Sequence, residues 1–135
     1  MNTINSLLNG IVLIALCVGA VIWFSMPHEY EVPNDAWFKS AVIDRPEPVL
    51  VKFGADWCGP CRMLDPELDK LRAHTGGHLG VVKIDVDHHQ ALAQHYGVSS
   101  IPRVFLFQNG KVVGDRTGYA DEGQLQDWIA SRIQP

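Results

Sequence analysis

The sequence has no run of basic residues, no internal repeat and no low-complexity segment. Its 11 Lys and Arg residues are scattered singly and are outnumbered by 15 Asp and Glu residues, which gives a formal net charge of -4. Because nucleic-acid binding needs clustered positive charge, this pattern argues against a nucleic-acid partner. The apolar content of 47% excludes a disordered chain, and 135 residues are enough for one domain with an appendage.

Charged side chains are also missing from residues 7–26. Twenty residues at helical rise cover about 30 Å, the thickness of the hydrocarbon core of a bilayer. Trp23 lies near the end of the run, where an aromatic anchor would meet the lipid headgroups. The sequence therefore predicts a single N-terminal transmembrane helix, with residues 1–28 as the anchor and residues 29–135 as the domain.

Two alternatives for this segment stay open. A cleaved signal peptide is disfavoured because no Lys or Arg precedes the run and no small-residue cleavage site follows it. A buried helix of a soluble domain is disfavoured because the segment has no polar face. Lys39 is the first basic residue, whereas Glu29, Glu31 and Asp35 follow the run more closely. We therefore expect a single-pass protein of the cytoplasmic membrane with an extracytoplasmic, periplasmic domain.

The rest of the chain alternates between apolar runs and turn residues in the manner of an α/β domain. Strands are expected at residues 49–55, 79–86, 104–107 and 111–113, the last two joined by a hairpin turn at Asn109 and Gly110. Helices are expected over residues 34–42, from the cysteine motif to Gly76 with a kink at Pro66, over residues 88–96 and from Asp121 onward. This order predicts a mixed central sheet, parallel in its first half and antiparallel at one edge, with helices on both faces.

Cysteine is scarce, with three in the chain, and two of them share the stretch WCGPC at residues 57–61. A zinc site is disfavoured because there is no second CxxC pair and because the adjacent His88 and His89 would point in different directions. A purely structural disulfide is disfavoured because closing a two-residue loop gains little entropy.

A redox role fits the position of the pair. The preceding strand places Cys58 at the amino end of the next helix, where free N–H groups and the helix dipole stabilise a thiolate. Cys61 follows one turn later, within bonding reach. One sulfur can attack a substrate disulfide, and the other can then resolve the mixed disulfide.

The motif WCGPC, the helix containing Pro66 and the later Ile101-Pro102 together resemble the thioredoxin family, from about Tyr30 to Ile133. The resemblance implies a thioredoxin fold that needs no metal or cofactor other than the redox-active disulfide Cys58–Cys61. It further implies that Cys58 is the exposed nucleophile, that Cys61 is the buried resolving cysteine, and that Pro102 follows a cis peptide bond and faces both.

The same resemblance implies an apolar surface that receives an extended substrate chain. It assigns Trp57, Gly97, Val98 and Ile101 to this surface, and Gly59, Pro60 and Arg103 are also expected to bind substrate. For Trp57 the alternative is packing in the core. For Arg103, where the family often has threonine, the alternatives are contact with an acidic substrate segment and extension into water.

Lys52 is the main departure from the family, which usually has a buried acid at this place in the strand. Lys83 matches a lysine common in the family and is expected to point into the same region. Two ammonium groups near the cysteines would favour thiolate and raise the redox potential above the value of about -270 mV typical of thioredoxin. Alternatively, Lys52 turns to solvent or pairs with Asp56 or Asp85. A second departure is Gly54, where the family often has tryptophan.

The function expected from these features is that of a membrane-tethered thiol–disulfide oxidoreductase. It would reduce or exchange disulfides of extracytoplasmic client proteins and receive electrons from an upstream membrane or soluble thiol reductant. One alternative is a disulfide-forming oxidase, which the Gly59-Pro60 dipeptide disfavours. The other is a non-catalytic binding module, which the presence of both cysteines together with Trp57 and Pro102 disfavours.

Overall fold

A computed structural model describes residues 35–133, so the predicted anchor at residues 1–28 lies outside the described part of the chain. The described elements are α2 (Ala36–Phe38), η1 (Lys39–Ile43), β1 (Val49–Gly54), α3 (Gly59–His74), β2 (Gly80–Asp85), α4 (Gln90–His95), β3 (Arg103–Gln108), β4 (Lys111–Thr117) and α5 (Glu122–Ala130). The four strands and the last three helices expected within this range are present. The clearest difference in length is β4, which continues four residues beyond its expected end at residue 113.

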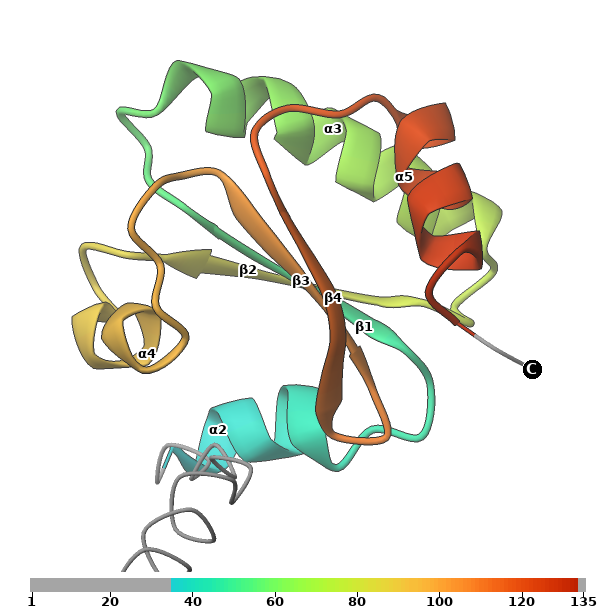
Figure 1. Ribbon diagram of the computed structural model, residues 1–135, viewed down its shortest axis with the longest axis horizontal. Helices are drawn as coiled ribbons and strands as arrows, with labels where there is room; N and C mark the ends of the chain where they lie inside the picture. Colours follow the sequence, from blue (N-terminus) through green and yellow to red (C-terminus); the bar gives the residue numbers. More distant parts are fainter. Residues whose placement is uncertain (1–34, 134–135) are drawn as a thin grey trace, which may run out of the picture. The chain divides into compact units, whose positions relative to one another are not determined.

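The four strands form one mixed sheet in the order β2-β1-β3-β4 (Figure 1). β1 pairs in parallel with β2, and α3 is the crossover between them; β3 pairs antiparallel with both β1 and β4. A parallel pair needs such a crossover, whereas the antiparallel pair β3–β4 needs only a tight turn. The expected mixed sheet is confirmed.

That tight turn has the backbone that its sequence predicts. Asn109 and Gly110 both have positive φ, 52° and 74°, as a two-residue hairpin requires. A Cβ atom on Gly110 would also lie 2.9 Å from the carbonyl oxygen of Ile43, so glycine lets the hairpin approach the end of η1.

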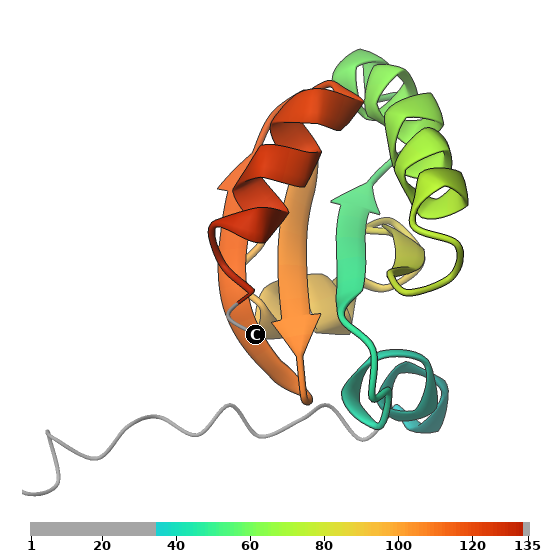
Figure 2. The ribbon, with the colours of Figure 1, turned by 90° about the vertical axis from the view of Figure 1, so that its right-hand side faces the viewer.

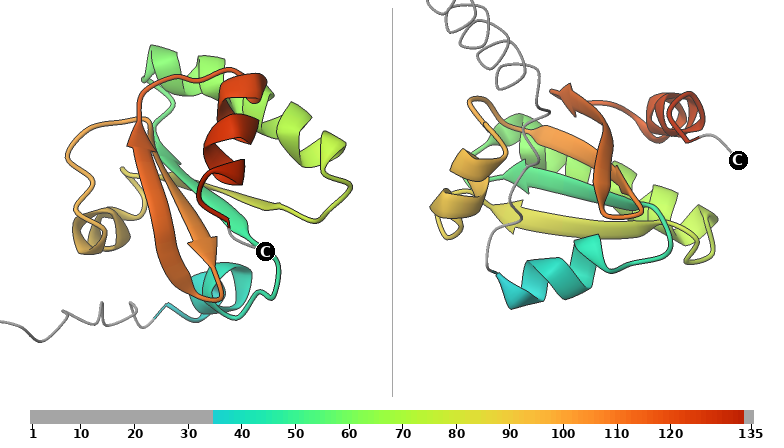
Figure 3. Two further views of the ribbon diagram at one scale, coloured as in Figure 1. Left: turned by 45° about the vertical axis from the view of Figure 1, so that its right-hand side comes forward. Right: turned by 60° about the horizontal axis from the view of Figure 1, so that its bottom comes forward.

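The sheet carries a different layer on each face. α3 and α5 lie on one side of it, and α2 and α4 on the other (Figures 2 and 3). β1 is buried along its whole length and alternates between the two layers. Val49, Val51 and Phe53 join one hydrophobic cluster, whereas Leu50 joins the other.

We call the first cluster the aromatic layer and the second the leucine layer. The aromatic layer packs Phe38, Phe53, Tyr96, Phe105 and Phe107 between the sheet and the helical segments α2, η1 and α4. The leucine layer is built mainly from Leu50, Leu64, Leu68, Leu71, Leu79, Val104, Leu106 and Leu125, between the sheet and helices α3 and α5.

The helix ends follow the sequence signals to different degrees. α5 begins with a full capping box, in which Asp121 Oδ1 accepts from the Gln124 N–H at 2.8 Å and Gln124 Oε1 accepts from the Asp121 N–H at 3.3 Å. α3 is one helix although Pro66 lies inside it. The expected first helix is instead a short α-turn followed by a π-helical turn, and Asp35 at its N-cap position makes no side-chain capping bond.

Candidate active site

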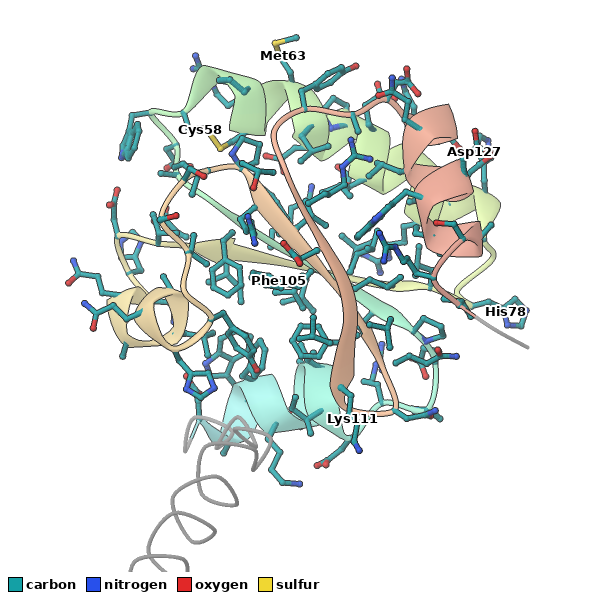
Figure 4. The ribbon with its side chains drawn as sticks, in the orientation of Figure 1. Cys58, Met63, His78, Phe105, Lys111 and Asp127 are labelled. Carbon is teal, nitrogen blue, oxygen red and sulfur yellow. A yellow bond between two sulfur atoms is a disulfide. The ribbon has the colours of Figure 1, made fainter. Side chains whose placement is uncertain are left out.

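The cysteine pair lies where β1 leads into α3. Cys58 and Cys61 form a disulfide, with their Cα atoms 5.2 Å apart. Cys58 occupies the N-cap of α3, and its Sγ accepts a hydrogen bond from the backbone N–H of Cys61 at 3.2 Å. Figure 4 shows Cys58 at this end of the helix. A sulfur in this position receives the N–H bonds and the dipole field that stabilise a thiolate when the disulfide is reduced.

The two sulfurs differ in burial. Cys61 is fully buried and begins the buried stripe of α3 that continues with Leu64, Leu68 and Leu71. Cys58 is 6% exposed. Cys58 was expected to be exposed, but it is buried in the oxidised protein and is only the less buried of the two cysteines.

The loop before β3 covers the cysteine pair from a distant part of the sequence. The peptide bond between Ile101 and Pro102 is cis, as expected. Ile101 packs against the cluster formed by Ala55, Cys58 and Cys61. Pro102 is buried, and its carbonyl oxygen accepts from the Gly118 N–H at 2.8 Å.

Trp57 is 70% exposed, so its indole is not part of the core. Its Nε1 donates a hydrogen bond to Asp87 Oδ2 at 2.8 Å. Asp87 is itself held by its own N–H, which donates to Asp85 Oδ1 at 2.8 Å. That N–H is the largest reason why the pKa of Asp85 lies below its usual value, with His88 a smaller one. The loop after β2 thus orients an exposed aromatic ring beside the disulfide.

The other residues expected at the substrate surface have different surroundings. Pro60 and Gly97 are exposed, and a Cβ atom on Gly59 or Gly97 would meet no atom within 4 Å. Gly97 has a positive φ of 62°, and Val98 is partly buried against the aromatic layer. Met63, one of the apolar residues at helical spacing in α3, is exposed and points away from the fold (Figure 4).

Lys52 is the one charged residue among the buried side chains of the described chain, with 6% of its surface exposed. Its Nζ donates to Asp65 Oδ1 at 2.8 Å. Lys52 thus pairs with Asp65 on α3. The alternatives considered from the sequence, exposure to solvent or pairing with Asp56 or Asp85, are not observed. Lys52 and Asp65 form a largely buried ion pair beneath the amino-terminal half of α3.

Lys83 lies beside Lys52, because the two residues are register partners on the parallel strands β1 and β2. Its Nζ contacts Asp69 Oδ1 at 2.9 Å and Asp65 Oδ1 at 3.7 Å. The two lysines of the sheet therefore face two aspartates of α3. This arrangement offsets the repulsion between like charges on adjacent strands.

Arg103 points along the hairpin. Its Nη1 donates to Thr117 Oγ1 at 2.6 Å, its Nη2 pairs with Asp115, and its guanidinium lies 5.5 Å from the centre of the Phe105 ring. The side chain is thus bound to β4, its partner strand.

Comparison with known proteins gives a consistent result. The family profile described as Thioredoxin matches residues 29–131. Thioredoxin of Haemophilus influenzae is 42% identical over 100 residues, 74% of this chain and 94% of that protein, and thioredoxin of Rickettsia felis is 38% identical over 100 residues, 74% and 95%. A solved structure titled "Structure of a malarial protein" is 26% identical, with a TM-score of 0.62, over 65% of this chain and 99% of the other.

The chain belongs to the thioredoxin family. It is a thiol–disulfide oxidoreductase, as its thioredoxin relatives are, and its redox-active group is the disulfide Cys58–Cys61. Thioredoxins act on protein disulfides together with a reductant and need no cofactor. In residues 35–133, no group of three or more His, Cys, Asp or Glu side chains is arranged to hold a metal ion.

The predicted location of this thioredoxin in the cytoplasmic membrane, with an extracytoplasmic domain, is wrong. Within the described part of the chain, no helix has both the length and the apolar character needed to span a bilayer. The Haemophilus and Rickettsia thioredoxins match over 94% and 95% of their own length, so they have no counterpart of the apolar segment. The prediction rested on the length and apolarity of residues 7–26, on Trp23 and on the charges that follow the run, and none of these features proves a membrane span.

Sequence reasoning missed two residues at the site of this thioredoxin. Asp65 lies four residues after Cys61, and this spacing places both on the same face of a helix, toward Lys52. That signal was available. Asp87, which orients Trp57, had no comparable signal, because the contact joins two loops 30 residues apart.

Proposed function

We propose that this thioredoxin reduces disulfide bonds in other proteins, with Cys58 as the nucleophile and Cys61 as the resolving cysteine. The observation that carries the proposal is the unequal placement of the two sulfurs. Cys58 caps α3 beside the exposed ring of Trp57, whereas Cys61 is fully buried behind it. A client disulfide therefore reaches Cys58 first, and Cys61 can react only after Cys58 has formed a mixed disulfide with the client.

The reaction then proceeds in two exchanges. The Cys58 thiolate attacks one client sulfur, a mixed disulfide forms, and the other client sulfur leaves as a thiolate that takes a proton from water. The Cys61 thiol loses its proton, and its thiolate attacks the Cys58 sulfur. The Cys58–Cys61 bond forms and the first client sulfur leaves. Two electrons pass to the client, and a separate thiol reductant restores the dithiol by the reverse exchanges.

The client chain is proposed to lie in extended form over the surface next to the disulfide. Trp57, Gly59, Pro60 and Gly97 offer open space or an exposed ring, and Ile101 packs against the cysteine cluster. Val98 and Pro102 are proposed to contribute to this surface, although Val98 is partly buried and Pro102 is buried. We assign the redox unit to residues 29–135, in agreement with the extent of the family match.

The buried ammonium of Lys52 supports a redox potential above the value of about -270 mV that is typical of thioredoxin. Asp65 limits that rise, because its carboxylate neutralises the ammonium at 2.8 Å. Lys83 is more exposed and pairs mainly with Asp69, so its contribution is smaller. A modest rise leaves the protein a reductant rather than a disulfide-forming oxidase.

Reduction of insulin by the full-length chain with dithiothreitol tests this function. Cys58→Ser is expected to abolish turnover, and Cys61→Ser is expected to accumulate mixed disulfides with the client. Cys17→Ser is the matched control, because it removes the cysteine outside the motif, and it should retain activity. Turnover by Cys58→Ser would contradict the assigned nucleophile, and faster oxidation of a reduced client than reduction of insulin would favour an oxidase.

A further inference from the structure

We propose that Lys52 is the counter-ion of the Cys61 thiolate in the reduced protein, and that Asp65 competes with this thiolate for the Lys52 ammonium. The inference rests on the proposed function, because it concerns the step in which Cys61 resolves the mixed disulfide. In the oxidised protein described here, Cys61 carries no charge and Lys52 pairs with Asp65 at 2.8 Å. After reduction, loss of the proton from the Cys61 thiol presents the same ammonium with a second anion.

Lys52 and Cys61 meet at the position of residue 54. A Cβ atom built on Gly54 would lie 2.5 Å from Lys52 Cε, 2.9 Å from Lys52 Nζ and 3.2 Å from Cys61 Sγ. The ammonium nitrogen and the sulfur are therefore no more than about 6 Å apart, the range in which an opposite charge favours an ionised group. Glycine at position 54 makes this approach possible, because any side chain there would occupy the space that the lysine fills.

Among the charged side chains near Cys61, Lys52 should have the largest effect on the stability of the Cys61 thiolate. The hydrophobic side chains packed around the cysteine pair are Ala55, Val86 and Ile101. On β3, the register partner of Lys52 is the uncharged Val104.

The other charged groups near Lys52 lie on α3 and β2. They are Asp65, Asp69 and Lys83, and the last two lie farther out, at 62% and 37% side-chain exposure. A charge held away from water acts more strongly than one near the surface, because solvent screens it less. The effect of Lys52 on Cys61 should therefore exceed that of Lys83.

The chemistry follows from this arrangement. When the disulfide is reduced, Cys61 becomes a thiol, and it must lose its proton to water before its sulfur can attack the Cys58 sulfur. The Lys52 ammonium stabilises the thiolate that this loss creates. The Asp65 carboxylate has the opposite effect, because it neutralises the ammonium and adds a negative charge nearby. Lys52 thus stabilises the Cys61 thiolate, whereas Asp65 destabilises it.

A stopped-flow reaction of the reduced full-length chain with an aromatic disulfide, 5,5′-dithiobis(2-nitrobenzoate), measures this step. Attack by Cys58 releases one coloured aryl thiolate at a rate proportional to reagent concentration. Attack by Cys61 on the mixed disulfide releases the second aryl thiolate at a rate that does not depend on the reagent concentration. Lys52→Met is expected to slow the second phase about tenfold at neutral pH and to move its pH midpoint upward by about one unit. Asp65→Asn, which keeps an acceptor for Lys52, should move the midpoint downward and speed the second phase about threefold at acidic pH.

The matched control is Asp69→Asn, which removes the exposed carboxylate of the same helix face and should leave the second phase unchanged. Gly54→Ala keeps both charges but displaces the lysine, so it should slow the second phase as Lys52→Met does. That variant decides the matter if Lys52→Met does not fold. The inference would be overturned if Lys52→Met and Gly54→Ala left the rate of the second phase unchanged, or if Asp65→Asn slowed it. Absence of two phases in the parent protein would instead overturn the proposed function.

Discussion

The two faces of the sheet are packed in different ways. The aromatic layer is built from rings in contact, such as Phe38 with Phe107 at 6.0 Å and Phe53 with Phe105 at 5.7 Å between ring centres. The leucine layer is aliphatic, and toward the active-site end its place on β1 is taken by Lys52, between Leu50 and Gly54. One face is a continuous apolar core, and the other has a charge built into it.

This difference shows how one sheet serves two purposes. The aromatic layer packs against β1 and β3, and Val86 packs against both this layer and the cysteine cluster. The leucine layer lies beneath α3, the helix that carries Cys61, so a polar group placed there acts on the reacting sulfur. The predictions below test whether stability and chemistry are divided between the faces in this way.

Truncation of a buried ring in the aromatic layer should have the largest effect on stability. Phe107 is 2% exposed and lies at the end of β3 away from the cysteines. Phe107→Ala is expected to lower the free energy of unfolding by about 3–5 kcal/mol, because it leaves a cavity among the rings. Urea unfolding measures the loss, and insulin reduction per folded molecule should not change.

Leu68→Ala is the counterpart of this change in the leucine layer. Leu68 is fully buried on α3, and its truncation is expected to cost about 2–5 kcal/mol. Comparable losses would show that the two layers contribute similarly to stability. A loss below about 1 kcal/mol for either variant would contradict the assigned core.

The buried ion pair should respond to its two substitutions with opposite signs. Lys52→Met replaces a buried charge by an apolar chain of similar length and should raise the free energy of unfolding of the oxidised protein by about 1 kcal/mol or more. Asp65→Ala strands the Lys52 ammonium and should lower it by about 2 kcal/mol, since Asp65 is partly exposed. Urea unfolding of both variants and of the double variant measures the coupling. Destabilisation by Lys52→Met would show that the pair stabilises the fold.

The sequence predicted the fold of the described region because its strongest signals are local. The NG hairpin, the helix start at Asp121 and the apolar run of β1 each depend on a few neighbouring residues. The position of Cys58 at the start of a helix could be predicted for the same reason. The π-helical turn at Lys39–Ile43 has no such signature, and the expected single helix was wrong there.

The charges of the site were harder to predict, because their partners lie on different elements. Lys52 was recognised as unusual, but its partner depends on how β1 packs against α3. The direction of Arg103 depends on the pairing of β3 with β4. Helical spacing could have identified Asp65, whereas the bond from Trp57 to Asp87 required the folded arrangement of two loops.

Tyr96 gives the aromatic layer its own dependence on pH. Burial raises the pKa of Tyr96 to about 12, so the folded state resists ionisation that the unfolded state undergoes near pH 10. The unfolded state then binds fewer protons, and the free energy of unfolding should fall by roughly 2 kcal/mol as pH rises through this interval. Tyr96→Phe should remove this part of the decline. Tyr119→Phe, at an exposed ring, is the control, and an equal change in both variants would contradict the prediction.

The smallest expected effect lies at the rim of the leucine layer, where Glu67 joins α3 to α5. Its carboxylate accepts from Lys70 Nζ at 2.8 Å and from the Glu122 N–H at 3.0 Å, and these bonds hold the pKa of Glu67 below its usual value. The stabilisation is present above the unfolded-state pKa and is lost as pH falls through the lower folded-state pKa. Glu67→Gln should therefore flatten the acid limb of the unfolding free energy, whereas Asp127→Asn, on the outer surface of α5 (Figure 4), should not. An acid limb that Glu67→Gln leaves unchanged would mean that the bond to Glu122 does not couple the two helices.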